Sequence, residues 1–212
     1  REANRYYGFT AQQTLDLVQT LYEKKLLTYP RTDSQFITDD MEDTARQVIS
    51  IVCRQLPLFS DVSITPDIAR VTDNSKVTDH HAILPTVQLE KQDVSALPQS
   101  EQKILNLVGM RLLCATGEKH TYAETQITLS CESYAFKTKG KTIVQNGWKA
   151  NEELFKASLK TKEKDDPMKS LPEVHEGDVL DGVSASVTEH FTTPPKQYTE
   201  AICCERGIRN RP

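Results

Sequence analysis

The spacing of apolar residues changes part-way along the chain, and this change limits the architectures that the chain can adopt. Up to about residue 118, apolar side chains recur every three or four residues, as they do on one face of an α-helix. From about residue 121 they alternate with polar residues, which is typical of strands. With no internal repeat apparent, this order predicts an α+β chain with a helical domain first and a β-rich one after it.

Three helices are expected in the first part. Thr10 and Gln13 form a capping-box pattern ahead of the first helix, and Thr38 opens the second, where aspartates suit the positive end of the helix dipole. Ser100 is expected to cap the third helix and Gly117 to end it. The buried faces are expected to contain Leu15, Val18, Leu21 and Tyr22 in the first helix, Met41, Val48, Ile49 and Val52 in the second, and Ile104, Leu107, Val108 and Leu112 in the third.

The second part shows three alternating runs and one charged stretch. The runs lie around residues 127–131, 134–136 and 183–187. Lys139-Gly140 lies between two such runs and suggests a hairpin turn. Residues 156–170 are charged and poor in apolar groups, so a mobile loop is expected there.

Composition narrows the class of protein. No apolar run approaches the roughly 20 residues that a membrane span needs. The five cysteines are odd in number and lack a CxxC pair, so free thiols in a reducing cytosol are expected. The net charge of −4 weighs mildly against a nucleic-acid partner, although DNA binding depends on the local placement of Lys and Arg. The start at Arg1, without a signal peptide or initiator Met, suggests a piece of a longer protein.

Residues 26–34 read LLTYPRTDS and carry the first candidate site. Pro30 favours an extended conformation for Tyr29, and residues two apart in an extended segment point the same way, so Tyr29 and Arg31 are expected to share a face. A cation helps a phenolate to form, and arginine also binds phosphate bidentately. A tyrosine packed in a turn beside a solvated arginine is the commoner explanation of such a tripeptide taken alone.

Residues 79–86 read DHHAILPT and carry the second. A histidine beside a phosphodiester can donate a hydrogen bond or relay a proton. Neighbouring histidines also raise the possibility of a metal site, but adjacent side chains diverge and no HxH or HxxxH spacing is present. By themselves, His80 and His81 are better explained as one surface and one half-buried histidine.

Together and in this order, LYEKKLLTYPRTDS and DHHAILPT closely resemble the type IA DNA topoisomerases, the bacterial topoisomerase III branch most of all. The active-site motif of that family is matched by Tyr29-Pro30-Arg31-Thr32-Asp33-Ser34. Its HxAIxP frame is matched from His80, so His80 and not His81 takes the functional place. The lead-in REANRYYGFTAQQTLDL, Gly147-Trp148 and PPKQYTEA at 194–201 resemble further family landmarks. The tail 202–212 departs from the pattern, and no function is assigned to Cys203, Cys204 or Arg209.

The resemblance implies roles for these residues. Tyr29 is expected to be the nucleophile, Arg31 and His80 to contact phosphate, and Thr32 and Ser34 either to contact the DNA backbone or to act as structural caps. Asp33 is expected to orient Arg31 or to cap a turn. The site residues expected to be catalytic are therefore Tyr29, Arg31 and His80, and those expected to bind DNA are Arg31, Thr32, Ser34 and His80.

The resemblance also implies an architecture and partners. Residues 1–118 are expected to be the tyrosine domain, 119–193 a β-rich segment of an arch, and 194–212 a connection to the next domain. The family binds Mg²⁺ in an acidic domain, but no DxDxE-type triad is present, so no metal site is expected here and the chain alone is expected to be inactive. Single-stranded DNA and the remaining domains of the polypeptide are the expected partners, in the bacterial cytoplasm at the nucleoid.

Two other classes remain open from the residues alone. One is a module that binds single-stranded DNA without catalysis, although no basic stripe interleaved with aromatic residues is visible. The other is an enzyme for a small molecule, which only the composition favours. Binding to a single-stranded oligonucleotide separates the second of these classes from the DNA-binding ones.

Overall fold

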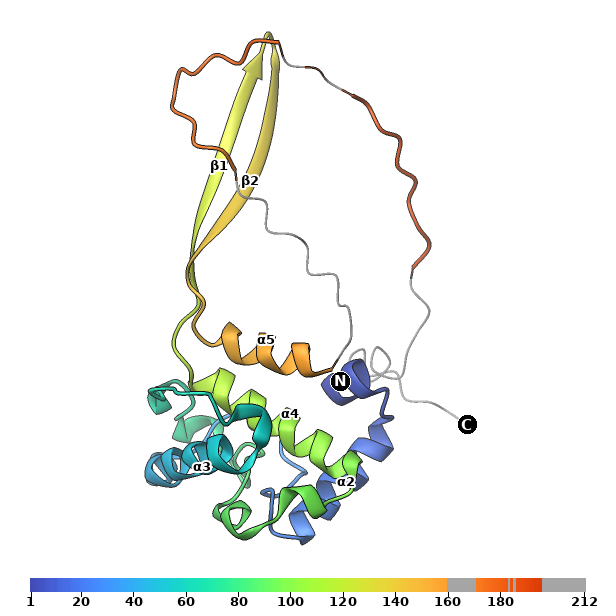
Figure 1. Cartoon of the computed structure of the whole chain (residues 1–212), viewed down its shortest axis with the longest axis vertical. Helices are drawn as coiled ribbons and strands as arrows, with labels where there is room; N and C mark the ends of the chain where they lie inside the picture. Colours follow the sequence, from blue (N-terminus) through green and yellow to red (C-terminus); the bar gives the residue numbers. More distant parts are fainter. Residues whose placement is uncertain (160–170, 183, 185, 196–212) are drawn as a thin grey trace. The chain divides into compact units, whose positions relative to one another are not determined.

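The computed structural model describes residues 1–159, 171–182, 184 and 186–195 (Figure 1). In this part of the chain, α-helices and one two-stranded sheet confirm the α+β class. The helices are α1 (Glu2–Tyr7), α2 (Ala11–Glu23), α3 (Glu42–Gln55), α4 (Gln99–Thr116) and α5 (Lys149–Ser158), and the strands are β1 (Thr121–Cys131) and β2 (Tyr134–Gln145). None of the described helices is long and apolar enough to span a bilayer.

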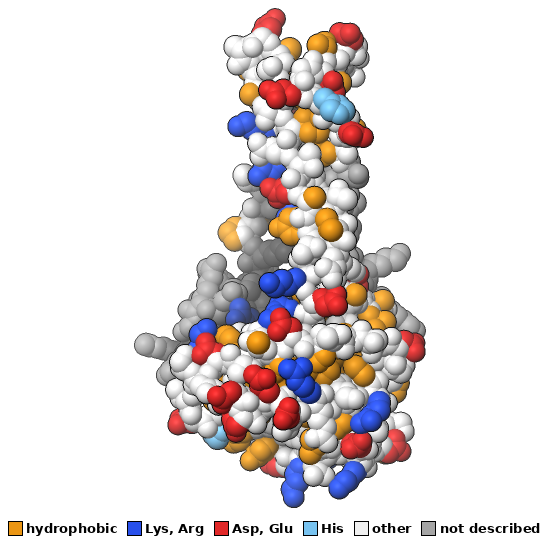
Figure 2. All heavy atoms as spheres, turned by 90° about the vertical axis from the view of Figure 1, so that its left-hand side faces the viewer, with side chains coloured by type: hydrophobic (Ala, Val, Ile, Leu, Met, Phe, Trp, Pro, Cys, Tyr) orange, Lys and Arg blue, Asp and Glu red, His pale blue; other side chains and the backbone are white. Residues whose placement is uncertain are grey.

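The described residues divide into two compact units. The first contains Arg1–Thr121 together with the segment from Val144 that includes α5. The second contains Tyr122–Ile143 of the hairpin and the described residues after 170. On the face drawn in Figure 2, acidic and basic side chains are interspersed over the helical unit rather than separated into a basic stripe.

Both ends of α2 are closed by local hydrogen bonds. The capping box is confirmed, because Thr10 Oγ1 accepts from the Gln13 backbone N at 3.1 Å and Gln13 Oε1 accepts from the Thr10 backbone N at 3.0 Å. At the other end, Lys25 takes a left-handed conformation (φ 61°). The Leu26 N then donates to the Leu21 carbonyl at 2.8 Å, which closes the helix end in a Schellman arrangement.

The starts of the next helices differ in part from expectation. Thr38 precedes a 3₁₀ turn at Asp39–Met41 that leads directly into α3, although its side chain makes no capping bond. The prediction that Ser100 caps α4 is wrong, since α4 starts at Gln99 after Pro98. The Pro98 carbonyl already accepts from the amides of the first turn, so the helix begins before Ser100. The end of α4 at Gly117 is confirmed.

The helical unit packs around a single apolar cluster. Most of the residues expected on the buried helix faces are buried there, including Val18, Leu21, Val48, Ile49, Val52, Ile104, Leu107 and Leu112. Gly109 lets α4 approach the end of α3, because a Cβ at this position would lie 2.9 Å from Leu56 Cδ1. Tyr22 was expected in the same stripe, and this was wrong: its side chain is 38% exposed and faces Tyr29 instead.

The hairpin turns at a different place from the one that was predicted. Its turn is Glu132-Ser133, where Glu132 has φ 52°, and Lys139-Gly140 lies inside β2. Gly140, which was expected to lie in a turn between two strands, is therefore a residue inside β2. Of the third alternating run, Val187 is 97% exposed and outside any strand, while residues 183 and 185 lie outside the described residues.

Two other expectations fall partly outside the described residues. Of the stretch 156–170, residues 156–158 belong to α5, so no loop starts there, and 160–170 are not among the described residues. Cys53, Cys114 and Cys131 are free thiols. Cys203 and Cys204, and most of the proposed connection 194–212, lie outside the described residues.

Candidate functional site

The two motif segments, residues 26–34 and 79–86, run side by side in the helical unit. The Thr28 N donates to the Leu84 carbonyl at 2.9 Å, and the Leu84 N donates to Thr28 Oγ1 at 2.9 Å. One step further, the Thr86 N donates to the Leu26 carbonyl at 3.0 Å. Leu27 and Pro85 form an antiparallel bridge between these contacts. The backbone before Tyr29 is therefore fixed to the second motif.

A second set of bonds joins the segments after Tyr29. Thr32 Oγ1 donates to the His80 carbonyl at 2.9 Å, and the Ala82 N donates to the Phe36 carbonyl at 2.9 Å. Pro30, which follows the tyrosine, is buried. Tyr29, which is half-buried, thus lies in a short stretch that is held at both ends, and this limits the positions that its phenol can take.

The ring of Tyr29 lies against two other aromatic rings. The centroid of the His80 imidazole is 4.3 Å from that of the Tyr29 ring, with the planes inclined at 40°. The Tyr22 ring packs edge to face against the Tyr29 ring, with the ring centroids 5.4 Å apart and the planes inclined at 79°. His81 turns elsewhere, with its Nδ1 2.8 Å from the Ala82 carbonyl oxygen. Of the two histidines, His80 is therefore the one beside Tyr29.

A polar pocket of about 380 Å³ lies beside the His80 ring. It is lined by Arg31, Thr32, Asp33, Thr78, Asp79 and His80. Among the described residues, no hydrogen bond or ion pair engages the exposed Arg31 guanidinium, and none joins it to Tyr29. Arg31 and His80 nevertheless line the same pocket, so one anion there can meet both a guanidinium and an imidazole.

The hydroxyls of Thr32 and Ser34 are engaged within the protein. Thr32 Oγ1 accepts from the Ser34 N at 3.1 Å in addition to its bond with the His80 carbonyl. Ser34 Oγ donates to the Lys76 carbonyl at 2.9 Å and accepts from the Phe36 N at 3.1 Å. Of the two roles expected for these hydroxyls, these bonds correspond to structural caps, and a contact with DNA stays a prediction.

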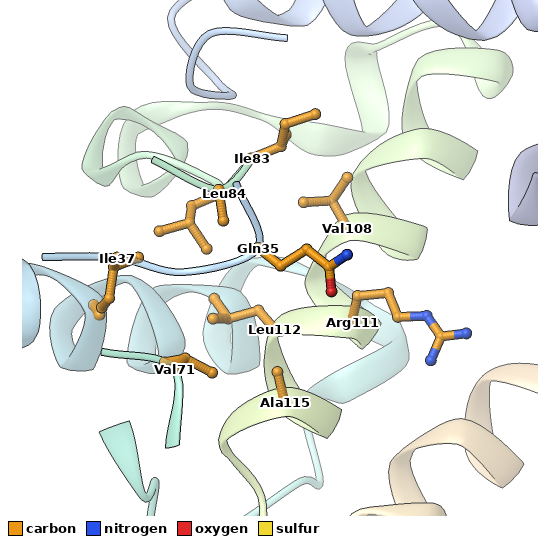
Figure 3. A pocket seen from close by; sticks show the side chains of 11 residues that line it. Gln35, Ile37, Val71, Ile83, Leu84, Val108, Arg111, Leu112 and Ala115 are labelled. Atoms are coloured by element: carbon orange, nitrogen blue, oxygen red, sulfur yellow. The ribbon is translucent and has the colours of Figure 1, made fainter. Parts of the chain in front are cut away.

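An apolar pocket of about 140 Å³ lies on another side of the motif segments (Figure 3). Gln35 and Ile37, which follow the first segment, and Ile83 of the second segment line it, while α4 supplies Val108, Arg111, Leu112 and Ala115. Arg111 is held by Glu2 of α1, to which its Nε donates at 2.5 Å. The mostly hydrocarbon lining offers no nucleophile, so this pocket is not the candidate site.

The carboxylates of the described residues do not gather into a magnesium site. Within the described residues, no group of three or more His, Cys, Asp or Glu side chains is placed to hold a metal ion. The polar pocket has only Asp33 and Asp79, and Arg31 lines the same pocket. No catalytic step is therefore assigned to a metal held by these residues.

The chain matches one family model and several curated proteins. A family model described as DNA topoisomerase matches residues 1–203. The chain is 33% identical over 206 residues to a DNA topoisomerase 3 of Bacillus licheniformis and to one of Bacillus subtilis, which covers 94% of the chain in each case. It is 34% identical over 208 residues, or 95% of the chain, to a DNA topoisomerase 3 of Bacillus thuringiensis. The chain spans 28% of the length of these relatives.

Proposed function

Because the chain belongs to the DNA topoisomerase family, we propose that it is the part of a type IA enzyme in which Tyr29 breaks and rejoins one strand of DNA. The observation that supports this role most directly is the position of the Tyr29 ring, 4.3 Å from the imidazole of His80. His80 in turn shares a polar pocket with Arg31. The proposed nucleophile and the two proposed phosphate-binding side chains thus come from two segments that are distant in the sequence.

The proposed reaction transfers a phosphodiester to the tyrosine and back. The phenolic oxygen of Tyr29 gives up its proton and bonds to phosphorus, and the bond from phosphorus to the 3′ oxygen breaks. The 3′ oxygen takes up a proton and leaves as a hydroxyl, while the 5′ phosphate stays on Tyr29. Attack by that hydroxyl reverses the step, and no external energy source such as ATP is needed because the phosphotyrosine ester conserves the bond energy.

Arg31 and His80 are proposed to bind the reacting phosphate. The guanidinium offsets the charge that builds up on the phosphate oxygens in the transition state. The imidazole of His80 donates a hydrogen bond to the scissile phosphate or to a neighbouring one. Thr32 and Ser34 act mainly through the loop that they hold together, and backbone contacts to DNA from these two residues are part of the proposal.

The remainder of the enzyme is proposed to supply what these residues do not. It contributes the acidic domain that binds Mg²⁺ and the gate through which a second strand passes. Residues 1–118 act as the tyrosine domain, 119–193 as a segment of the arch and 194–212 as a connection. Single-stranded DNA is the substrate, and the enzyme works in the cytoplasm, at the bacterial nucleoid.

The test is to replace Tyr29 by Phe in the complete enzyme. We expect loss of both the covalent protein–DNA adduct and the relaxation of supercoiled plasmid, with DNA binding largely retained, because only the phenolic oxygen is removed. Mass spectrometry of the wild-type enzyme trapped on cleaved DNA should locate the nucleotide adduct on Tyr29. Tyr122→Phe removes a phenolic oxygen from the hairpin and serves as the matched control. A Tyr29→Phe enzyme that still relaxes plasmid rules the assignment out.

The 212-residue chain by itself offers a second test. We expect it neither to cleave nor to relax DNA, with or without magnesium, because the acidic groups proposed for proton transfer and Mg²⁺ binding belong to the rest of the enzyme. Weak binding of single-stranded DNA that falls steeply with salt is expected to remain. A labelled band at the mass of the chain after incubation with labelled oligonucleotide contradicts this.

A further inference from the structure

Tyr29 has one aromatic contact that its proposed chemistry does not use. Its ring packs against the rings of His80 and Tyr22. Of these two neighbours, only His80 lines the polar pocket. Tyr22 lies near the C-terminal end of α2, seven positions before Tyr29, and its side chain is 38% exposed. Tyr29, the proposed nucleophile, thus contacts one ring from α2 and one from the second motif segment.

The backbone that carries Tyr22 is held firmly. Its carbonyl accepts from the Lys25 N at 2.8 Å, and the Leu21 carbonyl beside it accepts from the Leu26 N at 2.8 Å. Leu21, Leu26 and Leu27 are fully or almost fully buried, so the end of α2 and the segment that leads to Tyr29 are packed into the same core. His80, by contrast, belongs to an exposed stretch whose side chain is proposed to bind phosphate.

The position of the phenolic oxygen matters more than the strength of either contact. Attack requires the reacting atoms to approach to roughly 3–3.5 Å in line, and a misplacement of about 1 Å can cost about 100-fold in rate. A tyrosine oxygen lies at the far end of a long ring, so a small rotation of that ring displaces it substantially. Edge-to-face packing restricts such rotation.

We propose that Tyr22 is a positioning residue, which holds the ring of Tyr29 in the orientation needed for attack on phosphorus. The inference rests on the proposed function of Tyr29. The aromatic ring of Tyr22 is the part that acts, since no hydrogen bond of its hydroxyl is found among the described residues. Tyr22 therefore affects the rate of strand cleavage and not the affinity for DNA.

Single-turnover cleavage of a single-stranded oligonucleotide by the complete enzyme tests this. Tyr22→Leu should lower the cleavage rate by about 3- to 10-fold, the factor that corresponds to one edge-to-face pair. Tyr22→Phe, which keeps the ring, should cleave at close to the wild-type rate. The dissociation constant for DNA, measured with non-cleavable oligonucleotide, should stay within about twofold in both variants. Tyr122→Leu, at another exposed tyrosine, is the matched control and should change neither quantity.

The outcomes separate this inference from the function on which it rests. An unchanged cleavage rate in Tyr22→Leu overturns it, and so does weaker DNA binding at an unchanged rate, because Tyr22 would then contact DNA directly. If Tyr22→Leu fails to fold, Tyr22→Met repeats the measurement with an unbranched side chain. Tyr29→Phe is assayed in parallel: its activity overturns the proposed function itself, whereas an inactive Tyr29→Phe beside a fully active Tyr22→Leu overturns only the role of Tyr22.

Discussion

Thr28 and Leu84 are joined by two reciprocal hydrogen bonds. The backbone N of Thr28 donates to the Leu84 carbonyl, and the hydroxyl oxygen of Thr28 accepts from the Leu84 N, each at 2.9 Å. The same hydroxyl donates to the Ala82 carbonyl at 3.2 Å. One side chain therefore satisfies two backbone groups of the second motif, directly next to Tyr29.

Thr28→Val should destabilise the protein by about 1–2 kcal/mol. Valine keeps the shape of threonine but leaves the Leu84 N without an acceptor, in a place where Leu84 itself is buried. Urea unfolding of the two proteins measures the difference in free energy of unfolding. Thr14→Val is the matched control, because the hydroxyl of Thr14 bonds only the Thr10 carbonyl of its own helix, at 2.8 Å, and its loss should cost less than about 0.5 kcal/mol. Equal effects of the two substitutions contradict the role given to Thr28.

The two adjacent histidines should differ in their effect on cleavage. His80→Ala is expected to reduce formation of the covalent adduct clearly, though less than Tyr29→Phe, since it removes a ring contact and a proposed phosphate ligand. His81→Ala should have the weaker effect, because the bond found for the His81 ring among the described residues is to the neighbouring Ala82 carbonyl. Adduct yield on labelled oligonucleotide, read on a denaturing gel, compares them. A lower adduct yield from His81→Ala than from His80→Ala would identify His81, and not His80, as the functional histidine.

Lys24 forms the ion pair whose loss should matter most for stability. Its Nζ lies 2.7 Å from Oε2 of Glu101, whose side chain is only 7% exposed. Lys24→Met leaves that carboxylate buried without a cation, and it should cost about 1–2 kcal/mol once the partial exposure of Lys24 is taken into account. Arg54→Met breaks the exposed pair with Glu90 and should cost at most about 0.5 kcal/mol. Chemical denaturation of both variants provides the measurement, and a reversed order rejects the prediction.

Stability should decrease in alkaline solution. Burial raises the pKa of the Cys114 thiol to about 11 and that of the Tyr7 phenol to about 12. Both groups therefore hold their protons more tightly in the folded state than in the unfolded one. Their contribution is complete below the ordinary pKa of each group and is lost as the pH rises toward the folded values.

Urea unfolding at pH 8 and pH 10.5 measures this loss. The wild-type protein should lose about 2 kcal/mol over this interval through Cys114. Cys114→Ala should lower the stability at pH 8, because it leaves a cavity, but its dependence on pH should be flatter. Cys131→Ser changes an exposed thiol and should keep the wild-type slope. Parallel slopes in the Cys114→Ala and wild-type proteins are inconsistent with the raised pKa.

Much of the helical unit could be predicted from the sequence, because caps and apolar spacing act over a few residues. Thr10 and Gln13 are close enough in sequence for their reciprocal bonds to be read directly. The hairpin turn was misplaced because an exposed two-stranded ribbon leaves little burial signal, and Gly140 resembles a turn residue while lying in β2. The prediction that Ser100 caps α4 is wrong because Pro98, the residue before the helix, supplies the carbonyl that accepts the first hydrogen bonds of the helix.

The candidate site divides in the same way. Tyr29, Arg31 and His80 could be identified from the two motifs, but the sequence does not say that Tyr29 lies against His80. Tyr22 was missed because its spacing from Leu21 and Val18 fits a buried stripe, and only its position near the end of α2 turns it toward Tyr29. The hydroxyls of Thr32 and Ser34 bond carbonyls 48 and 42 residues away, a separation that local patterns do not reveal.

The bonds between the two motif segments also tie the proposed chemistry to folding kinetics. Thr28 bonds Ala82 and Leu84 across 54 and 56 residues, and all of α3 lies in the loop that these bonds close. Closing a flexible loop of that length costs about 3.5 kcal/mol plus a constant, so these bonds form only once the helices that surround them have packed. A newly made or partly unfolded chain therefore presents Tyr29 without His80. By the proposed mechanism, a molecule that has not finished folding therefore nicks DNA less efficiently than the folded enzyme, which can also reseal the break.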